Sequence, residues 1–542
     1  MSTILGAFSA ARQSILVNQR SLAVTGQNIA NVNTNGYSRQ RARIHALPQM
    51  GGATVYAIER LRDGFLDKQR AIAKGALGLA TARDEALSQL EMIVDETNAL
   101  GPFGMLSDLF TKIQDLSLRP TGLPEREGLR SSAISLANGL HTMRRRLEEL
   151  QQRQDDLVKE EIEKVNQITS QIAGINAAIN RAGATDVGAN EMLDRRMELV
   201  HQLSELVDAR YYEDSDGLFT IVFAGGFSLV EGDHAASLKA EANPDNNGFA
   251  NVVLRRTGDM TIDVTDRLAT GRLAGLLNTR DEDVANQIQR FDKFAAQLAA
   301  RFNVQHRAGY DLAGQTNIDF FRVVDVYGAR RSDNQGDARI TDAQVLDQAA
   351  LTFDDYEIRF TAPDAYQIVN LTTQNTTSGT YASGAPIVFD GVSVTISGTV
   401  SDGDAFSVNT THGAASAIAL SAQVAADLSA IAASADGLQG DNGNALALAA
   451  LETQGVFNQG TATFGHFLSA NLTALGVAAQ RARDDLETQE MIVAQVDGMI
   501  QSLSGVSLDE ESTYLLQYER AFQAGARVIQ TLDELLQTII SI

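Results

Sequence analysis

Both ends of this 542-residue chain carry an apolar stripe with a coiled-coil period, and this feature most constrains how the chain folds. Near the N-terminus the stripe follows alternating steps of four and three residues, which place its members on one face of a helix. Its members are Ile4, Phe8, Ala11, Ile15, Asn18, Leu22, Thr25 and Ile29. Polar members lower the stability of such a seam but can fix its register. The pattern predicts a helix that needs a partner along its length.

The same stepping recurs near the C-terminus. Its members are Leu515, Tyr518, Phe522, Gly525, Ile529, Leu532, Leu536 and Ile539. Ser507 and Glu510 form a capping-box pattern, which predicts that this helix begins near Leu508. Because both stripes run almost to the chain ends, we favour pairing of the two helices and contacts with other subunits. Packing of each helix into an ordinary globular core is the alternative.

Charge is also divided between the ends. Residues 1–58 contain no Asp or Glu and have a local charge of +5, whereas residues 508–542 have a local charge of −4. The five cations near the N-terminus are Arg12, Arg20, Arg39, Arg41 and Arg43. Opposite charges would draw the two ends together. Chance variation in an acidic protein is the alternative explanation.

The composition excludes several classes of protein. The chain has 44 Lys and Arg against 68 Asp and Glu, and a net charge of −24 argues against nucleic acid or an anionic membrane as a partner. It has no cysteine, which excludes disulfides, thiolate nucleophiles and Cys-based metal sites. The first twenty residues lack the apolar run of a secretory signal. We therefore expect any export to proceed without a cleaved signal.

Helical periodicity dominates the middle of the chain. It predicts long helices at about residues 130–181, 192–207, 284–306 and 480–503. Strand periodicity with hairpin-type turns replaces it near 211–262 and at 322–436. We expect an α+β multidomain fold: an elongated helical bundle or coiled coil formed by both termini and the middle, with β-rich insertions and a β-rich outer domain.

These patterns give three expected domains. Residues 1–45 and 505–542 would form a terminal helical domain. Residues 46–321 and 437–504 would form the long-helix bundle, which includes the β-rich segment near 211–262. Residues 322–436 would form the β-rich outer domain.

Signatures of catalysis are missing from the sequence. There is no GxGxxG, P-loop or GxSxG motif, and the seven histidines lack metal-site spacing. Two short acidic clusters, at 214–216 and 402–404, do not continue into a calcium loop, and we interpret them as turns. No pair of carboxylates stands out for glycoside hydrolysis. We therefore predict no catalytic residue, no cofactor and no metal.

One string near the N-terminus is unusual. Residues 27–40 read QNIANVNTNGYSRQ: a helix end, then Asn and Gly residues that tolerate left-handed backbone, then an extended basic segment. This string resembles the N-x-A-N-x-x-T-x-G-Y signature of the axial proteins of the bacterial flagellum, which are the rod, hook and hook-associated proteins. The matching residues are Asn28, Ala30, Asn31, Thr34, Gly36 and Tyr37.

Further segments narrow the resemblance to the family of flagellar hook-associated protein 1. Residues 504–511, SGVSLDEE, resemble that family's SGVNLDEE segment, with Ser507 in place of the commoner Asn. Residues 271–280 and 302–321 resemble its GGLL and FNxxHxxGxDxxGxxGxxFF segments. The likeness covers both ends and the helical middle. Residues 322–436 are unplaced, as expected of a variable outer domain.

The resemblance implies a structural, non-enzymatic part of the flagellum that forms the junction layer between hook and filament. Such proteins assemble with copies of themselves on the hook protein, and the second junction protein and the filament build on them. They reach this extracellular site through the flagellar type III export apparatus, after a dedicated chaperone has held their C-terminal region in the cytoplasm. The corresponding assembly and chaperone residues here are Leu515, Tyr518, Phe522, Ile529, Leu532 and Leu536.

We further hypothesise that the two terminal helices pair antiparallel in an inner tube and stay largely unfolded until the subunit assembles. Ordering them costs roughly 1–2 kcal/mol of backbone entropy per residue, which neighbouring subunits would offset. Another axial protein, such as a hook protein, is the alternative within the same class. From a different class, the β-rich segment 322–436 would be a glycan-cleaving lobe on an axial scaffold.

Overall fold

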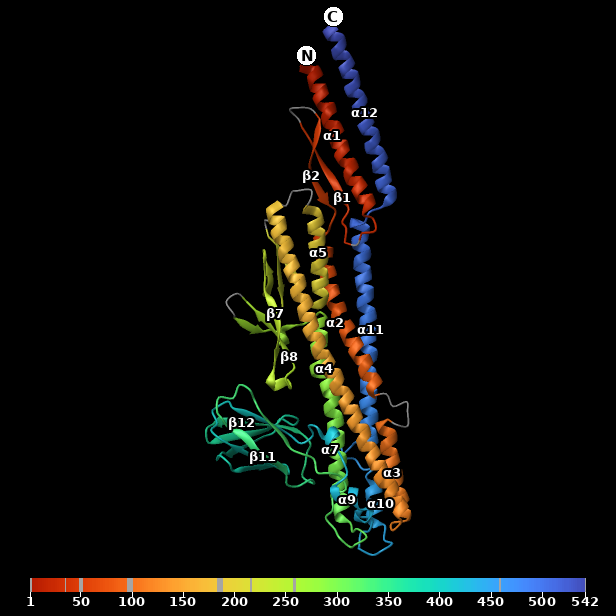
Figure 1. Ribbon diagram of the computed structural model, residues 1–542, viewed down its shortest axis with the longest axis vertical. Coiled ribbons are helices and arrows are strands. Elements are labelled where there is room, and N and C mark those ends of the chain that lie inside the picture. Colours follow the sequence, from red (N-terminus) through yellow and green to blue (C-terminus); the bar gives the residue numbers. More distant parts are fainter. Residues whose placement is uncertain are drawn as a thin grey trace.

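The computed structural model describes residues 2–34, 36–47, 52–94, 101–182, 189–214, 217–256, 260–457 and 460–541. A long rod of helices runs through the molecule, two β-rich lobes lie on one side of it, and both chain ends lie together at one end of the rod (Figure 1). Helices and antiparallel sheets coexist, so the predicted α+β multidomain architecture is confirmed.

The rod consists of helices that pack along one another, and the two β-rich lobes are inserted between some of them. They are α2 (Gly64–Val94), α3 (Pro102–Leu118), α4 (Leu123–Ala182), α5 (Ala189–Leu206), α6 (Arg272–Asn278), α7 (Ala285–Ala308), α10 (Gly443–Ala450) and α11 (Phe464–Ser504). A π-helical turn, η3 (Thr279–Val284), joins α6 to α7. All four helices predicted for the middle of the chain are present, and α11 begins earlier than predicted because Thr463 caps it by accepting a hydrogen bond from the His466 backbone.

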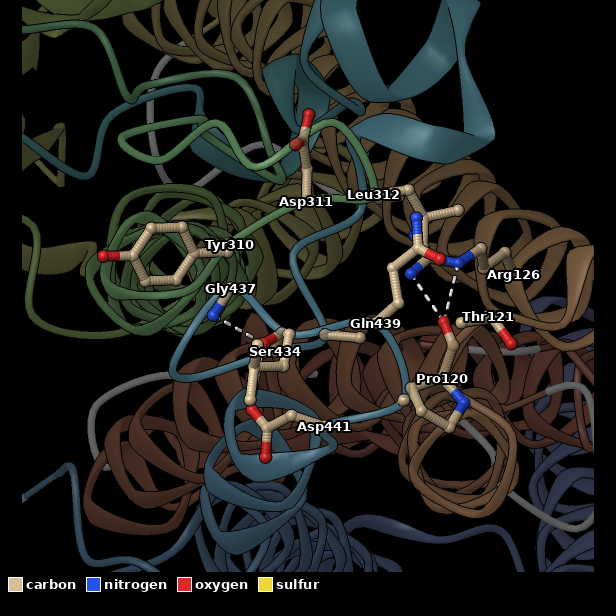
Figure 2. Close-up of a pocket in the computed structure, with 13 residues that line it drawn as sticks. Pro120, Thr121, Arg126, Tyr310, Asp311, Leu312, Ser434, Gly437, Gln439 and Asp441 are labelled. Carbon is tan, nitrogen blue, oxygen red and sulfur yellow. Dashed lines mark hydrogen bonds between the residues drawn. The ribbon is translucent and has the colours of Figure 1, made fainter.

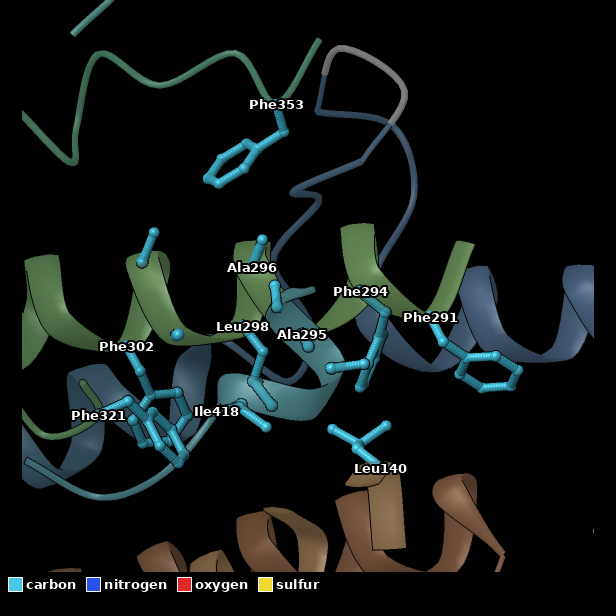
Figure 3. Packing of buried hydrophobic residues seen from close by; sticks show 14 of the residues in the cluster. Leu140, Phe291, Phe294, Ala295, Ala296, Leu298, Phe302, Phe321, Phe353 and Ile418 are labelled. Carbon is cyan, nitrogen blue, oxygen red and sulfur yellow. The ribbon is translucent and has the colours of Figure 1, made fainter. Parts of the chain in front are cut away.

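The main core lies where α7 crosses the lower half of α4. Phe291, Phe294 and Phe302 of α7 are almost fully buried and point towards α4 and the segments beside it (Figure 3). Leu140 of α4 and Phe321 complete this apolar cluster, each with no exposed surface. Side chains of this size, fully buried, contribute most of the stability of a domain of this kind.

Two polar residues of the 302–321 segment have structural roles in this core. The Asn303 amide donates to the Phe321 carbonyl and accepts from the Phe320 and Phe321 backbone. His306 contacts the Ile318 carbonyl through Nδ1 and accepts from the Ala432 backbone through Nε2, and burial lowers its pKa to about 4. These side chains satisfy backbone groups of the segment that leaves the rod and of the segment that returns to it.

The first β-rich lobe lies against α4 and confirms the strands predicted near 211–262. It has a four-stranded and a three-stranded antiparallel sheet. Their strands are β3 (Arg210–Glu213), β4 (Phe219–Phe223), β5 (Phe227–Glu231) and β6 (His234–Ala235), and β7 (Ser237–Ala242), β8 (Ala250–Arg255) and β9 (Thr261–Asp263). Short 3-10 turns, η1 (Pro244–Asn246) and η2 (Thr265–Arg267), flank β8 and β9. Buried Asn176 of α4 holds the lobe by donating to two of its carbonyls.

The second, outer lobe contains sheets of five and three antiparallel strands. The strands are β10 (Tyr327–Arg330), β11 (Arg339–Val345), β12 (Asp355–Ala362), β13 (Ala365–Asn370), β14 (Thr376–Thr380), β15 (Pro386–Phe389), β16 (Val392–Ser397) and β17 (Ala405–Asn409). A two-stranded neck joins this lobe to the rod, with bridges between Tyr310 and Ser434 and between Phe321 and Leu420. All strands of the lobe lie within the expected outer domain.

The C-terminal part of the range expected for the outer domain lies on the rod instead. Residues 410–436 contain α8 (Ala414–Ala417), α9 (Ala422–Ala426) and η4 (Leu428–Ala430). Asp292 of α7 accepts from the backbone of Gly413 and Ala415 at the start of α8, and Arg144 of α4 donates to the same carboxylate. These contacts bind the segment to the rod, so the outer lobe ends near residue 409 rather than 436.

The terminal unit comprises α1 (Ser2–Ala30), the hairpin β1 (Gln40–Ala46) and β2 (Ala53–Arg60), and α12 (Leu508–Ser541). In Figure 1, α1 and α12 lie side by side and run in opposite directions at one end of the molecule. The expected boundary at residue 45 falls inside β1. Because β2 pairs with β1 as far as Arg60, the unit extends to residue 60.

Candidate assembly site at the paired termini

The contact between α1 and α12 uses the predicted seams. Gly525 of α12 is buried against α1, and a Cβ there would lie 3.1 Å from Cγ1 of Ile15. Ala11 is buried beside it, with 7% of its surface exposed. Ten further apolar seam residues are half-buried: Phe8, Ile15, Leu22 and Ile29 of α1, and Leu515, Tyr518, Phe522, Ile529, Leu532 and Leu536 of α12. Of the polar members, Thr25 is buried and Asn18 is half-buried. The side chains of Ile4 and Ile539 lie outside the described residues. We call this side of α1 its seam face.

A second buried face of α1 lies on the β1–β2 hairpin. Val17, Ser21, Val24 and Asn28 recur in steps of four and three and are all buried. Arg20 at the edge of this face donates to the Val55 carbonyl of β2. This hairpin face was not predicted from the sequence, although its period was readable, because no hairpin was predicted for the face to cover.

Asn28 of the family motif sits where α1, the hairpin and α12 meet. Its side-chain NH2 donates to the Gln40 carbonyl at 2.9 Å and to Glu511 Oε2 at 3.1 Å. Its side-chain oxygen accepts from the Tyr37 hydroxyl at 2.8 Å and from the Gln40 backbone at 3.0 Å. An Asn amide has two donors and two acceptor sites, and all four are used here in a side chain that is 1% exposed. The position therefore requires Asn.

Glu511 connects the C-terminal helix to this point. Its carboxylate is almost fully buried and pairs with Arg39 Nε at 2.7 Å, while the exposed Glu510 pairs with Arg39 Nη1 at 2.8 Å. Burial alone would lower the pKa of Arg39, but the hydrogen bonds to both carboxylates raise it. Glu511 lies in the first turn of α12, where the helix dipole also favours a negative charge.

Of the five N-terminal arginines, Arg39 alone pairs with the acidic C-terminal segment within the described residues. Arg41 and Arg43 pair instead with Glu59 across the hairpin, at 3.1 and 2.5 Å. The predicted attraction between the ends is therefore concentrated at one buried point. The rest of the charge is left on the surface.

The remaining motif residues shape the turn that leads from α1 into β1. Gly36 has φ +79°, which favours glycine. The Asn31 amide donates back to the Gln27 carbonyl, and the Thr34 hydroxyl donates to the Asn31 side chain. Burial, with Asp194 and Glu511 nearby, raises the pKa of Tyr37 to about 12, so its hydroxyl remains a donor. Ala30 is exposed and makes no such contact.

Helix α5 anchors this turn to the rod. Asp194 is buried and accepts from the Ser38 hydroxyl at 2.8 Å, from the Ser38 backbone at 3.1 Å and from Arg60 at 2.9 Å. Asn190, one turn earlier, donates to the Gln40 side chain and to the Ile58 carbonyl. Neither Asp194 nor Asn190 was predicted as a site residue. In the sequence, only their helical spacing of four residues marks them as a polar pair. Their partners, on both strands of the hairpin and just before it, are visible only in the structure.

The described residues offer little for chemistry or for a membrane. No three His, Asp or Glu side chains among them gather as a metal site would require. The cavity in Figure 2, at the rod end far from the termini, measures about 10 Å³, which is room for about one water molecule. Beside it Arg126 donates to the Pro120 and Ile431 carbonyls, and burial lowers its pKa to about 10. Among the described helices, none is long and apolar enough to span a bilayer.

Comparison with known proteins gives matches along most of the chain. Residues 87–321 match the helical domain of flagellar hook-associated protein FlgK, residues 329–410 the D2-like domain of flagellar hook-associated protein 1, and residues 496–542 the C-terminal region of flagellar basal body rod FlgEFG proteins. The D2-like match coincides with the outer lobe.

Whole-chain relatives and a solved structure agree with these matches. Flagellar hook-associated protein 1 of Escherichia coli (strain K12) is 27% identical over 536 residues, which cover 97% of each chain. That of Bacillus subtilis (strain 168) is 24% identical over 583 residues, covering 100% of this chain and 98% of its own. The flagellar hook junction protein FlgK from Burkholderia pseudomallei has the same fold, with a TM-score of 0.70 and 20% identity over 81% of this chain and 100% of its own. The chain therefore belongs to the family of flagellar hook-associated protein 1.

Proposed function

We propose that this chain is a structural axial subunit of the bacterial flagellum that forms the junction layer between hook and filament. The observation that carries this proposal is the antiparallel pairing of the two chain ends, fixed at the buried Asn28–Glu511–Arg39 cluster. A unit built from both ends of one chain presents the same two helices in every copy. Identical copies that join through different surfaces generate rings or helical layers.

The energetics of the terminal unit favour assembly. Ten predicted seam residues are only half-buried in the single chain, so apolar area remains for neighbouring subunits to cover. Each Å² of apolar surface removed from water contributes roughly 25 cal/mol. We infer that copies in the layer supply this burial and complete the order of α1 and α12.

The proposed partners follow from the family. Copies of this chain would stand on the hook protein and carry the second junction protein and the filament above them. A dedicated chaperone would cover the α12 seam in the cytoplasm, and the type III export apparatus would deliver the chain to an extracellular site. The proposal includes no catalytic activity.

Substitution in the α12 seam tests this function. Phe522→Asp and Leu532→Asp each place a carboxylate in the apolar contact with α1. We expect both variants to keep a folded rod, by circular dichroism and thermal unfolding, and to be absent from the ends of isolated hooks. Gln517→Asp, at an exposed position of the same helix, is the matched control and should assemble. Filaments on hooks in cells whose only copy is Phe522→Asp would contradict the proposal.

A hook protein is the second candidate, favoured by the match of residues 496–542 to the rod proteins' C-terminal region. The two functions differ in extent of assembly. A hook protein forms long tubes with copies of itself, whereas a junction protein stops after a thin layer. Electron microscopy of the purified chain at high concentration distinguishes them, and we expect no long tubes.

A further inference from the structure

A loop of the outer lobe contacts helix α7 beside the neck. It joins β11 to β12 and comprises residues 346–354, which we call the brace. Gln348 of the brace is buried. Its side-chain oxygen accepts from the Asn303 amide of α7 at 3.1 Å, and its NH2 group donates to Asp319 of the neck at 3.2 Å. A buried amide with both ends bonded fixes the brace in position on the rod.

Two apolar side chains of the brace enter the main core. Leu351 and Phe353 are 3% and 4% exposed, and in Figure 3 the Phe353 ring points towards α7. Phe353 has φ +60°, a left-handed conformation that a bulky residue adopts only at a cost in free energy. Such a conformation persists only where the surrounding contacts compensate for it. The contacts that can compensate here are those of the brace with the rod.

The brace is also fixed to its own lobe. The backbone N–H groups of Leu346 and Asp347 donate to the Gly391 carbonyl at the turn between β15 and β16. The hydroxyls of Thr352 and Tyr356 lie 2.6 Å apart, which joins the brace to β12. The brace therefore moves with the outer lobe. If the lobe is displaced, the contacts that break are those between the brace and the rod.

The outer lobe touches the first β-rich lobe at a second contact. Ser332 donates to the Asp245 carboxylate of η1 through its backbone, at 2.8 Å, and through its hydroxyl. Both residues are exposed, so water competes for these hydrogen bonds and the contact adds little stability by itself. The first lobe is held on the rod, where the Asn246 amide donates to Asp281 of η3 at 2.9 Å. The contact between the lobes therefore depends on the brace.

We propose that the brace is a detachable clamp, which gives the outer lobe a docked and an undocked position. In the docked position the brace lies on α7, and in the undocked position the lobe swings on the two-stranded neck. Burial of Leu351 and Phe353 favours docking, whereas the backbone strain at Phe353 opposes it. The bridges of the neck lie outside the brace, so the lobe can yield to a lateral push without unfolding the rod. This inference does not depend on the proposed axial function.

Disulfide formation measures the docked position, because the chain has no cysteine of its own. Asp245→Cys with Ser332→Cys joins the two lobes only while the outer lobe is docked. Asp337→Cys with Thr399→Cys is the matched control. Thr399 donates to Asp337 through its backbone and its hydroxyl, as Ser332 does to Asp245, but both control residues lie in the outer lobe. The free full-length chain is oxidised mildly at low concentration, and the loss of free thiols is followed. We expect both pairs to react.

Substitutions in the brace are then added to each cysteine pair. Phe353→Ala should slow the reaction between the lobes about tenfold and leave the control pair unchanged, because loss of the buried ring shifts the lobe to the undocked position. Gln348→Ala removes polar contacts only and should slow it less. If neither variant slows the reaction between the lobes, or if that pair does not react in the unsubstituted brace although the control does, the inference is wrong. If Phe353→Ala also slows the control pair, the lobe itself is disturbed and Gln348→Ala decides: a slower reaction between the lobes supports the clamp, and an unchanged one contradicts it.

Discussion

The lower rod and the terminal unit contain helices of similar length, yet they are stabilised in different ways. Helix α7 buries apolar side chains along most of its length against α4 and the segments beside it (Figure 3). In α12, by contrast, only Glu511 and Gly525 are buried among the residues with described side chains. Helix α1 is intermediate, because the hairpin covers one of its faces.

This difference separates folding from assembly. The rod satisfies its own apolar surface and should fold in a single chain. The terminal unit uses a buried polar cluster to fix which helix meets which, and leaves most of its apolar seam half-covered. Helical stability in proteins comes mainly from the packing of an apolar face. The terminal helices therefore depend on neighbours in a way that α7 does not.

Hydrogen exchange on the free chain should give the largest contrast. We expect amides of α7 to exchange roughly a thousandfold more slowly than those of α12, because opening the rod requires most of its unfolding free energy. Mass spectrometry of peptides from the two helices measures the ratio. Equal protection of α7 and α12 in the free chain would mean that the termini are self-sufficient, and the comparison would fail.

Phe302→Ala should have the largest effect of any single substitution. Phe302 has no exposed surface and contacts the rings of Phe110, Phe320 and Phe321. Removal of a fully buried ring leaves a cavity and costs about 3–5 kcal/mol. Denaturant unfolding, followed by circular dichroism, measures this loss. If Phe302→Ala lowered the free energy of unfolding less than a seam substitution does, the rod would not be the more stable of the two regions.

Asn28→Ala should loosen the terminal unit and leave the rod unchanged. It removes four hydrogen bonds and leaves the buried Glu511 with one partner fewer, which costs about 1–3 kcal/mol. The expected result is faster hydrogen exchange at the start of β1 and in the first turns of α12, with unchanged exchange in α7. Asn31→Ala, which removes a local helix-end contact only, is the control. Slower assembly with unaltered exchange would instead indicate a direct contact between Asn28 and another subunit.

Acid should weaken the rod through His201. This side chain of α5 is buried, its Nδ1 lies 2.9 Å from Arg70 of α2, and burial together with that cation lowers its pKa from 6.5 to about 3. The unfolded chain then binds a proton that the folded chain does not, so stability present above pH 6.5 is lost as the pH falls towards 3. We expect a loss of about 1–2 kcal/mol between about pH 7 and pH 5.

The matched variant for this pH profile is His201→Gln, which cannot take up a proton. Its unfolding free energy should change less between the same two pH values than that of the parent chain. His306 contributes in the same direction through its lowered pKa and remains in both proteins. An unchanged pH slope in His201→Gln would assign the acid sensitivity to other groups.

Phe522→Ala should have the smallest effect on the free chain. Its side chain is half-buried against α1 in the single chain, so its truncation should cost less than about 1 kcal/mol there. Incorporation into hook ends should nevertheless fall clearly relative to Gln517→Ala. A seam residue should thus affect incorporation more than the stability of the free chain. A rod residue such as Phe302 should affect the stability of the free chain more.

Long periodic elements were predictable from the sequence, and short polar connections were not. The seams and the four middle helices were readable because apolar residues repeat over several turns. The hairpin face of α1 was not, since Ser21 and Asn28 interrupt its apolar period and acquire meaning only with β1 and β2 in place. Asp194 and Glu511 were missed as site residues because their partners lie far away in sequence, at Ser38 and Arg39.

The expected end of the outer domain, at residue 436, lies beyond the point where the backbone returns to the rod. Residues 410–436 are rich in small residues and resemble the outer lobe in composition, but Asp292 and Arg144 hold their start on the rod. The opposite charges of the two ends are visible in the sequence. Within the described residues, however, only Arg39 pairs with the acidic C-terminal segment, and neither Arg12 nor Arg20 pairs with a carboxylate. A single sequence contains no information on which charges a subunit keeps for its neighbours.

The two-stranded neck has a consequence for how such a protein can vary. The chain leaves the rod and comes back to it through adjacent strands, and the bridges at Tyr310–Ser434 and Phe321–Leu420 lie below the first paired strands of the lobe, β10 and β17. The whole stretch between Tyr327 and Asn409 is thus, topologically, one large loop inserted into the rod. Lineages can enlarge, trim or exchange what faces the surroundings at that point, and an engineer can graft a foreign module there, while the polymer underneath keeps its shape.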